Sequence, residues 1–366
     1  MTQDCFDTLD ATHFLSHYWQ KKPLLIPNGV AAQALTVSPD ALAGLALEEG
    51  VDSRIVSSQD GIWQQSRGPF DATHFQVPGP WTLLVQGVDR LIPEVAALRA
   101  YVGFLPTWRF DDIMVSFATD GGSVGPHYDR YDVFLVQGKG CRRWKLGPTC
   151  DNATPTITHG ELSLLADFPV QEEYLLTTGD VLYVPPHVAH WGTAEGESMT
   201  YSIGFRAPRI ADLVARLADQ TLDSVDSELL LTDAGAITPS QSAGEIRPQD
   251  FENVRGAVFN TLEALDSENW FGELLSEQGE PVSPILHRTE LVAIAPCAKV
   301  FWRRDINGCH VFANGAVSPP FETAIIPTLI ALCGGEAVAV VQPRADSLLL
   351  DFLDEAGALY DPMDID

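Results

Sequence analysis

Between residues 54 and 205 the chain alternates short apolar segments with glycine, proline and aspartate. Short segments of this kind, bounded by turn residues, are typical of β-strands joined by tight turns. The pattern therefore predicts a mainly β sandwich or barrel with helices packed outside it. The nine predicted strands read RIVSS, GIWQQS, WTLLVQGV, IMVSFA, YDVFLVQ, RRWKL, EYLLTT, DVLYVP and MTYSIGF.

Two helices are expected before these strands. In THFLSHYWQKKPLLIPNG, aromatic residues recur at helical spacing until Pro23, and Leu24 to Ile26 begin a strand. In SPDALAGLALEEG, Ser38 is the expected N-terminal cap and Gly50 the expected stop.

The pattern changes near Pro208. RIADLVARLADQTLD and FENVRGAVFNTLEALDSENWFGELLSEQG have apolar residues every three or four positions, which predicts helices. From about residue 280 we expect a third unit with a helix or strand at 289–295, a hairpin turning at Asn307-Gly308, and helices at 321–333 and 347–360. Helices with a two-stranded wing suggest a winged-helix module. The predicted domains are therefore 1–207, 208–279 and 280–366.

The charge of the chain limits its partners. Its 366 residues include 50 Asp and Glu but only 22 Lys and Arg, a formal net charge of -28. Such a chain repels nucleic acid and membrane surfaces and attracts cationic partners, although acidity also serves solubility alone. We therefore expect the C-terminal unit to contact protein rather than DNA.

The cellular compartment is predicted from what the sequence lacks. No run of about eighteen apolar residues occurs, and the N-terminus MTQDCFDTLD is acidic where a secretory signal is basic. The six cysteines show no CxxC pairing, so we expect reduced thiols and a cytoplasmic protein.

The stretch GPHYDRYDVFLVQGKGCRRWKLG combines metal-ligating and basic residues. If His127 to Gln137 form a strand, alternation places His127 and Asp129 on one face. An imidazole from elsewhere would complete two histidines and one carboxylate around a metal. GDVLYVPPHVAHWG supplies two candidates, His187 and His190, just after a rigid proline pair.

The next predicted strand turns an arginine inward. Across the turn at 138–140, alternation places Arg142 with Trp144 and Leu146, and Arg143 on the opposite side. A buried guanidinium needs an anion, and a carboxylate is its best partner. That partner is either a bound dicarboxylate that also chelates the metal or an acid of the protein itself.

These residues resemble the JmjC-type ribosomal oxygenases of the cupin superfamily, and in particular the bacterial branch that hydroxylates an arginine of large-subunit ribosomal protein sixteen. The resemblance covers most of the first 206 residues and part of the helical segment. It rests on YWQKKPLLI, WTLLVQGVDR, DDIMVSFATDGGSVGPHYDRYDVFLVQGKGCRRWKLG, GDVLYVPPHVAHWG, YSIGFRAP and WFGELLS.

The resemblance implies a double-stranded β-helix in which His127, Asp129 and His190 bind Fe(II). It also implies that Arg142 holds the distal carboxylate of 2-oxoglutarate, which reacts with dioxygen to give succinate and carbon dioxide. The family pattern has glycine at His187, so we expect the metal at His190 and His187 at the rim.

Five further residues are candidates for contacts with the co-substrate or the substrate. Ser116 and Ser202 could reach the co-substrate by strand alternation. Asp120, Tyr131 and Asp132 could surround a substrate guanidinium, because a carboxylate beside an aromatic ring suits that group.

The partners follow from the same resemblance. It implies a homodimer formed through the helices at 210–222 and 251–265, a C-terminal winged-helix domain, and a basic ribosomal protein as substrate. Two alternatives stay open: a ribosomal-protein histidine hydroxylase with the same chemistry, and a non-catalytic scaffold.

Overall fold

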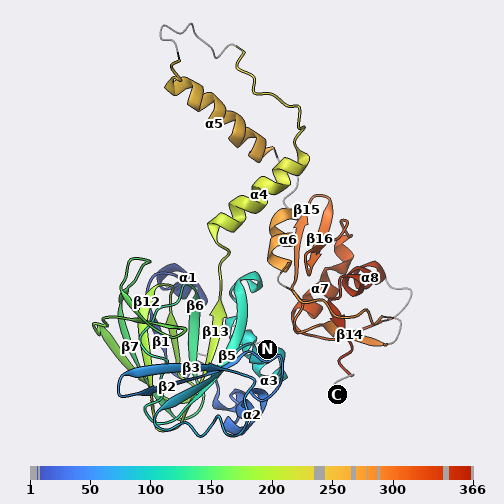
Figure 1. Ribbon diagram of the computed structural model, residues 1–366. Helices are drawn as coiled ribbons and strands as arrows, with labels where there is room; N and C mark the ends of the chain where they lie inside the picture. The colour runs from blue at the N-terminus through green and yellow to red at the C-terminus, as the bar shows by residue number, and fades with distance from the viewer. Residues whose placement is uncertain are drawn as a thin grey trace. The chain divides into compact units, whose positions relative to one another are not determined.

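The computed structural model describes residue 6 and residues 9–234, 244–264, 269–277, 279–286, 289–340 and 346–363. The chain divides into two compact units, Met1–Ala207 and Pro208–Asp366 (Figure 1). None of the described helices combines the length and apolar character that a membrane span requires. The described cysteines carry free thiols, and Cys5 lies outside the described residues.

The first unit is built from antiparallel sheets (Figure 1). Its large sheet has the order β1-β11-β6-β13-β5-β4-β2-β3, and a smaller sheet has the order β10-β7-β12. The strands of the large sheet are β1 (Leu24–Ile26), β2 (Ser53–Gln59), β3 (Ile62–Arg67), β4 (Trp81–Val85), β5 (Phe110–Ala118), β6 (Asp132–Gln137), β11 (Val181–Val184) and β13 (Ser198–Phe205). Those of the smaller sheet are β7 (Cys141–Thr149), β10 (Glu172–Leu176) and β12 (Val188–Glu195), and β8 (Thr156–His159) pairs with β9 (Leu162–Leu165) as a separate hairpin.

Helices cover one face of the large sheet, and their ends follow the local sequence. α1 (Ala11–His17) begins at Asp10, whose side chain accepts a hydrogen bond from the backbone of His13 at 3.0 Å. α2 (Pro39–Leu45) begins at the predicted cap Ser38 but ends well before Gly50. Together with α3 (Pro93–Ala96), these helices bury the aromatic core of the unit.

Alternation along β6 separates two environments. Phe134 and Val136 pack in the core under the helices, whereas Val133 and Leu135 face the space between the two sheets. Burying an apolar side chain of this size contributes roughly 1.5–3 kcal/mol, so both faces of β6 hold it in register. The neighbouring β13 turns Ser202 toward the same space.

All nine predicted strands are present, but three elements differ from the prediction. β6 begins at Asp132 rather than at His127, because residues 127–131 leave the large sheet and His127 instead bridges His190. β12 and the hairpin β8–β9 were not predicted. β12 begins at Val188, two residues after the proline pair at which the predicted strand DVLYVP ends.

The second unit contains α4 (Ile210–Ser224), α5 (Pro248–Glu263) and α6 (Asn269–Ser276), which confirms the predicted helices; Leu265, the last residue of the predicted second helix, lies outside the described residues. α6 packs on a sheet of the order β15-β16-β17. The other elements are β14 (Leu291–Ile294), β15 (Val300–Asp305), β16 (Gly308–Ala313), β17 (Ala316–Val317), α7 (Ile326–Cys333), β18 (Val338–Ala339), α8 (Ser347–Glu355) and β19 (Leu359–Tyr360).

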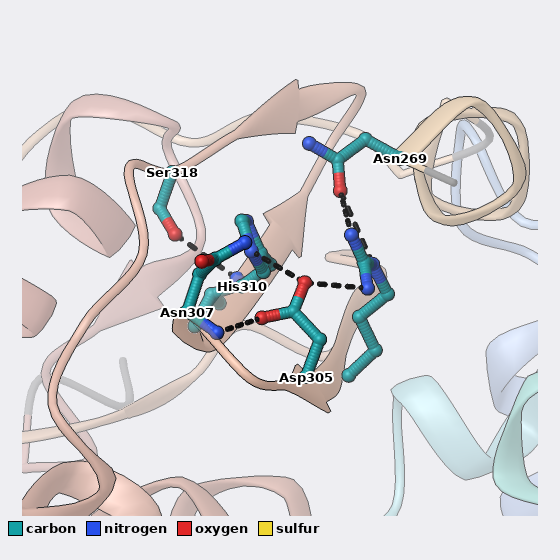
Figure 2. A network of polar contacts seen from close by, with 7 residues as sticks. Asn269, Asp305, Asn307, His310 and Ser318 are labelled. Atoms are coloured by element: carbon teal, nitrogen blue, oxygen red, sulfur yellow. Dashed lines mark hydrogen bonds and ion pairs between the residues drawn. The ribbon is translucent and has the colours of Figure 1, made fainter. Parts of the chain in front are cut away.

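The hairpin β15–β16 turns one residue earlier than predicted. Asp305 pairs with Gly308, so Ile306 and Asn307 form the loop. The Asp305 carboxylate accepts a hydrogen bond from the backbone of Asn307 at 2.8 Å and lies 3.1 Å from Nε2 of His310 (Figure 2). Arg303 links this carboxylate to Asn269 of α6, so the network joins the helix to the hairpin.

Candidate active site

Three side chains that can ligate a metal meet in the first unit. His127 and Asp129 lie just before β6, and His190 lies in β12 of the other sheet. Nε2 of His190 is 3.5 Å and Nε2 of His127 is 4.0 Å from Oδ2 of Asp129. One ligand atom from each residue lies within 4.8 Å of the others. The structure therefore brings the two predicted segments together, and among the described residues His190 rather than His187 belongs to the cluster.

Backbone pairing aims both imidazoles. His127 and His190 exchange two backbone hydrogen bonds, of 3.1 and 2.8 Å. Nδ1 of His127 lies 2.9 Å from the carbonyl of Gly125, and Nδ1 of His190 lies 2.9 Å from the carbonyl of Val188. A proton held at Nδ1 leaves the lone pair of Nε2 directed at the cluster, which is the arrangement of a metal-binding histidine.

The pKa shifts of the three candidate ligands bear on whether they can bind a cation. Burial lowers the pKa of His127 to about 4, with help from the nearby charges of His190 and Arg54. Burial opposes ionisation of Asp129, but hydrogen bonding to His190 and the adjacent imidazoles lower its pKa to about 2. Neutral imidazole and ionised carboxylate are the forms that bind metals. Burial lowers the pKa of His190, but the Asp129 carboxylate raises it, and the net effect is a rise. A bound cation would therefore compete with a proton at His190.

A cavity of about 320 Å³ opens beside the cluster and is lined by both sheets. Arg142 of β7 enters it and is only 3% exposed. Its Nη1 donates weakly to Thr200 Oγ1 at 3.3 Å and to Ser116 Oγ at 3.5 Å, and its buried Nε has no hydrogen-bond partner. Within the described part of the chain, no carboxylate forms an ion pair with it, so a protein acid does not balance this charge.

The other predicted residues divide into two groups. Ser116, Ser202 and Tyr131 line the cavity. Asp120 and Asp132 are absent from its lining.

Both aspartates instead have partners outside the cavity. Oδ1 of Asp120 accepts a hydrogen bond from the backbone of Gly196 at 2.8 Å, which holds a turn. Asp132 is completely buried and accepts hydrogen bonds from Tyr183 at 2.6 Å and Gln20 at 3.0 Å. Local spacing suggested these residues, but their side chains serve the fold.

His187 takes no part in the metal cluster. Its backbone has a left-handed φ of 68°, and its ring stacks on Tyr128 with centroids 5.8 Å apart. Its backbone N–H donates to the carbonyl of Asp129 at 2.6 Å. His187 therefore supports the segment that carries a ligand.

The lining residues that sequence reasoning missed include Asp112, Met114 and Arg54. Asp112 is 5% exposed, and its Oδ2 accepts hydrogen bonds from the side chain of Gln86 at 2.6 Å and the backbone of Gly87 at 2.8 Å. Burial raises its pKa. Strand alternation from Ser116 back along β5 reaches Met114 and Asp112, so a signal for these two was present.

Comparison with known proteins gives a consistent result. A family model described as the JmjC domain matches residues 97–213. The ribosomal protein uL16 3-hydroxylase of Escherichia coli (strain K12) is 38% identical over 271 residues, which cover 74% of this chain and 72% of that protein. A probable ribosomal oxygenase of Haemophilus influenzae is 35% identical over 268 residues, covering 69% of this chain and 65% of that protein.

Solved structures agree over nearly the whole chain. The X-ray structure of Escherichia coli YcfD matches with a TM-score of 0.78 at 32% identity, covering 96% of this chain and 98% of that one. The structure of that ribosomal oxygenase in complex with cobalt and 2-oxoglutarate matches with a TM-score of 0.77, also at 32% identity, over 97% of this chain and 99% of that one. The chain therefore belongs to the JmjC-domain family of ribosomal oxygenases.

Proposed function

We propose that this protein is an Fe(II)- and 2-oxoglutarate-dependent hydroxylase that modifies an arginine side chain of a large-subunit ribosomal protein. The observation that carries the proposal is the cluster of His127, Asp129 and His190 beside a cavity that contains the buried guanidinium of Arg142, which has no carboxylate partner among the described residues. A related structure binds cobalt and 2-oxoglutarate, and a related enzyme acts on uL16.

The donor set fits ferrous iron. Two neutral imidazoles and one carboxylate on one side of an ion leave the other side open, which is the arrangement of non-haem iron oxygenases. In this proposal His127, Asp129 and His190 hold the iron, which when bound supplies the activation of dioxygen. Backbone pairing of the two histidine segments keeps the three ligands together in the absence of metal.

Arg142 fits the distal carboxylate of 2-oxoglutarate. Its Nε lacks a partner, and its two hydroxyl contacts are long, so the guanidinium retains donors for an anion. Arginine binds a carboxylate through two parallel hydrogen bonds. Ser116 and Thr200 would complete this end of the site, and Ser202 lies on the wall of the same cavity.

A cationic target residue is supported by the lining of the cavity. Oδ2 of Asp112 accepts hydrogen bonds from Gln86 and Gly87. This carboxylate lies on the cavity wall with Met114 and Tyr131. An arginine side chain could lay its methylenes along the apolar groups and direct its guanidinium at a carboxylate. The net charge of -28 would also attract a basic ribosomal protein.

The hypothesis of a non-catalytic scaffold accounts less well for the buried charge of Arg142. A buried cation without a carboxylate partner costs several kcal/mol, and a scaffold gains nothing from that cost. Histidine fits the cavity less well as the target, because a neutral imidazole has less use for the Asp112 carboxylate than a guanidinium has.

The second unit is proposed to hold the dimer contact. α4 and α5 expose large apolar side chains, among them Ile210 at 73% and Phe251 at 65%. A second copy of the chain would cover them. We also propose that the C-terminal elements, with the hairpin β15–β16 as a wing, contact protein rather than DNA, because the acidic charge of the chain disfavours nucleic acid.

The function is tested by incubating the full-length protein with Fe(II), 2-oxoglutarate and ribosomal peptides. We expect the mass of one oxygen atom to be added, and fragmentation to locate it on an arginine. Asp129→Ala serves as the control without a complete metal site. Addition at histidine would establish the alternative, whereas no product with any ribosomal peptide would refute the proposed substrate.

A further inference from the structure

A second guanidinium without a carboxylate partner lies in the same cavity. Arg54 of β2 pairs in register with Leu84 of β4, which pairs with Ser116 of β5, which in turn pairs with Thr200 of β13. Arg54 therefore stands in one row across the sheet with the two hydroxyl residues that contact Arg142. Two strand spacings, about 10 Å, separate the backbones of Arg54 and Ser116.

The contacts of Arg54 are poor for a charged group. Its Nη2 approaches only the thioether of Met114, at 3.9 Å, and a thioether is a weak acceptor. Over the described residues, no carboxylate lies within ion-pairing distance of this guanidinium. Arg54 is nevertheless half-buried and lines the cavity.

The other arginines at this cavity differ. Nε of Arg67 lies 2.8 Å from Glu161, and Nε of Arg206 lies 2.6 Å from Asp111. Arg54 is thus comparable to Arg142: both line the cavity, and neither forms an ion pair with a carboxylate of the described residues. A guanidinium in such a place is matched to an anion that binds there.

We infer that Arg54 is a second carboxylate-binding group, which receives the carboxylate of 2-oxoglutarate that Arg142 does not hold. This inference rests on the proposed use of 2-oxoglutarate. The co-substrate carries two carboxylates, and Arg142 accounts for the distal one. The other, next to the ketone, would chelate the metal through one oxygen and leave its second oxygen to accept hydrogen bonds from Arg54.

The electrostatics favour the co-substrate over the peptide as the source of this carboxylate. A bare Arg54 would repel the guanidinium of an arginine substrate from the cavity that contains Asp112. A carboxylate bound first would remove that repulsion. Binding of 2-oxoglutarate should therefore strengthen binding of the cationic peptide, and Arg54 should carry part of this coupling.

The test compares Arg54→Met and Arg54→Lys with the wild-type protein, each full-length and loaded with cobalt. Affinity for 2-oxoglutarate is measured by calorimetry without peptide. We expect Arg54→Met to weaken it by about tenfold or more, the effect of losing a charge-assisted hydrogen bond. The affinity of Arg54→Lys for 2-oxoglutarate should lie between those of Arg54→Met and the wild-type protein, because lysine keeps the charge but not the bidentate geometry.

Arg67→Met is the matched control. Arg67 pairs in register with Arg54 and lines the same cavity, but it is exposed and forms an ion pair with Glu161. Its replacement should therefore change the affinity for 2-oxoglutarate by less than about fivefold. Thermal unfolding of each variant checks that it folds.

A monocarboxylate separates the two ends of the site. 2-Oxobutyrate retains the carboxylate assigned to Arg54 and lacks the one assigned to Arg142. Arg54→Met should weaken binding of both acids, whereas Arg142→Met should weaken only 2-oxoglutarate.

Three outcomes would count against these assignments. Unchanged affinity of Arg54→Met for 2-oxoglutarate would overturn the inference, and so would a loss confined to binding of a fluorescently labelled arginine peptide. If the wild-type protein itself failed to bind 2-oxoglutarate, the proposed function would fall first.

Discussion

Replacing Arg142 with methionine should make the protein more stable and abolish its use of 2-oxoglutarate. The guanidinium is 3% exposed and has no carboxylate partner among the described residues. Methionine fills a similar volume without charge. Stability and function are therefore expected to change in opposite directions.

The expected gain in the free energy of unfolding follows from the burial of the Arg142 charge. Burial lowers the pKa of Arg142 from its usual range to about 10. At 1.36 kcal/mol for each pKa unit, the charged form costs about 3 kcal/mol in the folded protein. The long hydrogen bonds to Ser116 and Thr200 return about 1 kcal/mol. The free energy of unfolding should therefore rise by about 2 kcal/mol in Arg142→Met.

The loss of binding should be larger. Two hydrogen bonds between guanidinium and carboxylate, at about 1.5–3 kcal/mol each, correspond to a hundredfold or greater rise in Kd for 2-oxoglutarate. In the wild-type protein, 2-oxoglutarate at about 100 times its Kd should add roughly 2.7 kcal/mol to the free energy of unfolding, whereas the same concentration should add less than about 0.5 kcal/mol in the variant.

Urea denaturation with and without 2-oxoglutarate measures both quantities. Arg143→Met is the matched control, because Arg143 lies next along β7 on the opposite face and pairs with Glu173 and Glu195, each at 2.6 Å. It should leave binding of 2-oxoglutarate unchanged. An Arg142→Met protein that is less stable than wild type, or that binds 2-oxoglutarate equally well, would refute the reasoning.

Four further predictions follow from named contacts. Asp129→Ala should remove binding of cobalt, measured by calorimetry, while circular dichroism stays that of the folded protein, because the cores do not depend on the metal. Asp112→Asn should weaken binding of an arginine peptide but not of 2-oxoglutarate. Because burial raises the pKa of Asp112, its carboxylate accepts a proton and stops attracting the peptide as pH falls through that pKa, so wild-type affinity should fall at acidic pH and the affinity of Asp112→Asn should be less sensitive. Asp132→Ala should lower the free energy of unfolding by about 3–5 kcal/mol, since it leaves Tyr183 and Arg109 without their buried carboxylate, and should spare affinity for 2-oxoglutarate. Hydroxylation of a basic ribosomal protein should slow as salt rises, and a rate independent of salt would exclude long-range attraction.

Several features of the site could be predicted because they depend on neighbouring residues. The inward direction of Arg142 follows from alternation with Trp144 and Leu146, and all three are buried. The same rule would have found Asp112 from Ser116. It does not apply to Asp120 and Asp132, whose carboxylates bind a turn and a buried tyrosine. Which side of a strand faces a cavity depends on what packs against it.

The amino-acid pattern by itself determined the mainly β first unit, the helices that follow it, and the choice of a His-x-Asp segment and a later histidine as candidate ligands. These depend on periodicity and on short motifs, which are properties of adjacent residues. Only the tertiary structure decided that His127 bridges His190 and that Arg54 shares a row with Ser116 and Thr200. The reason is that strand order and register bring together residues far apart in the chain, and no local pattern encodes which strands become neighbours.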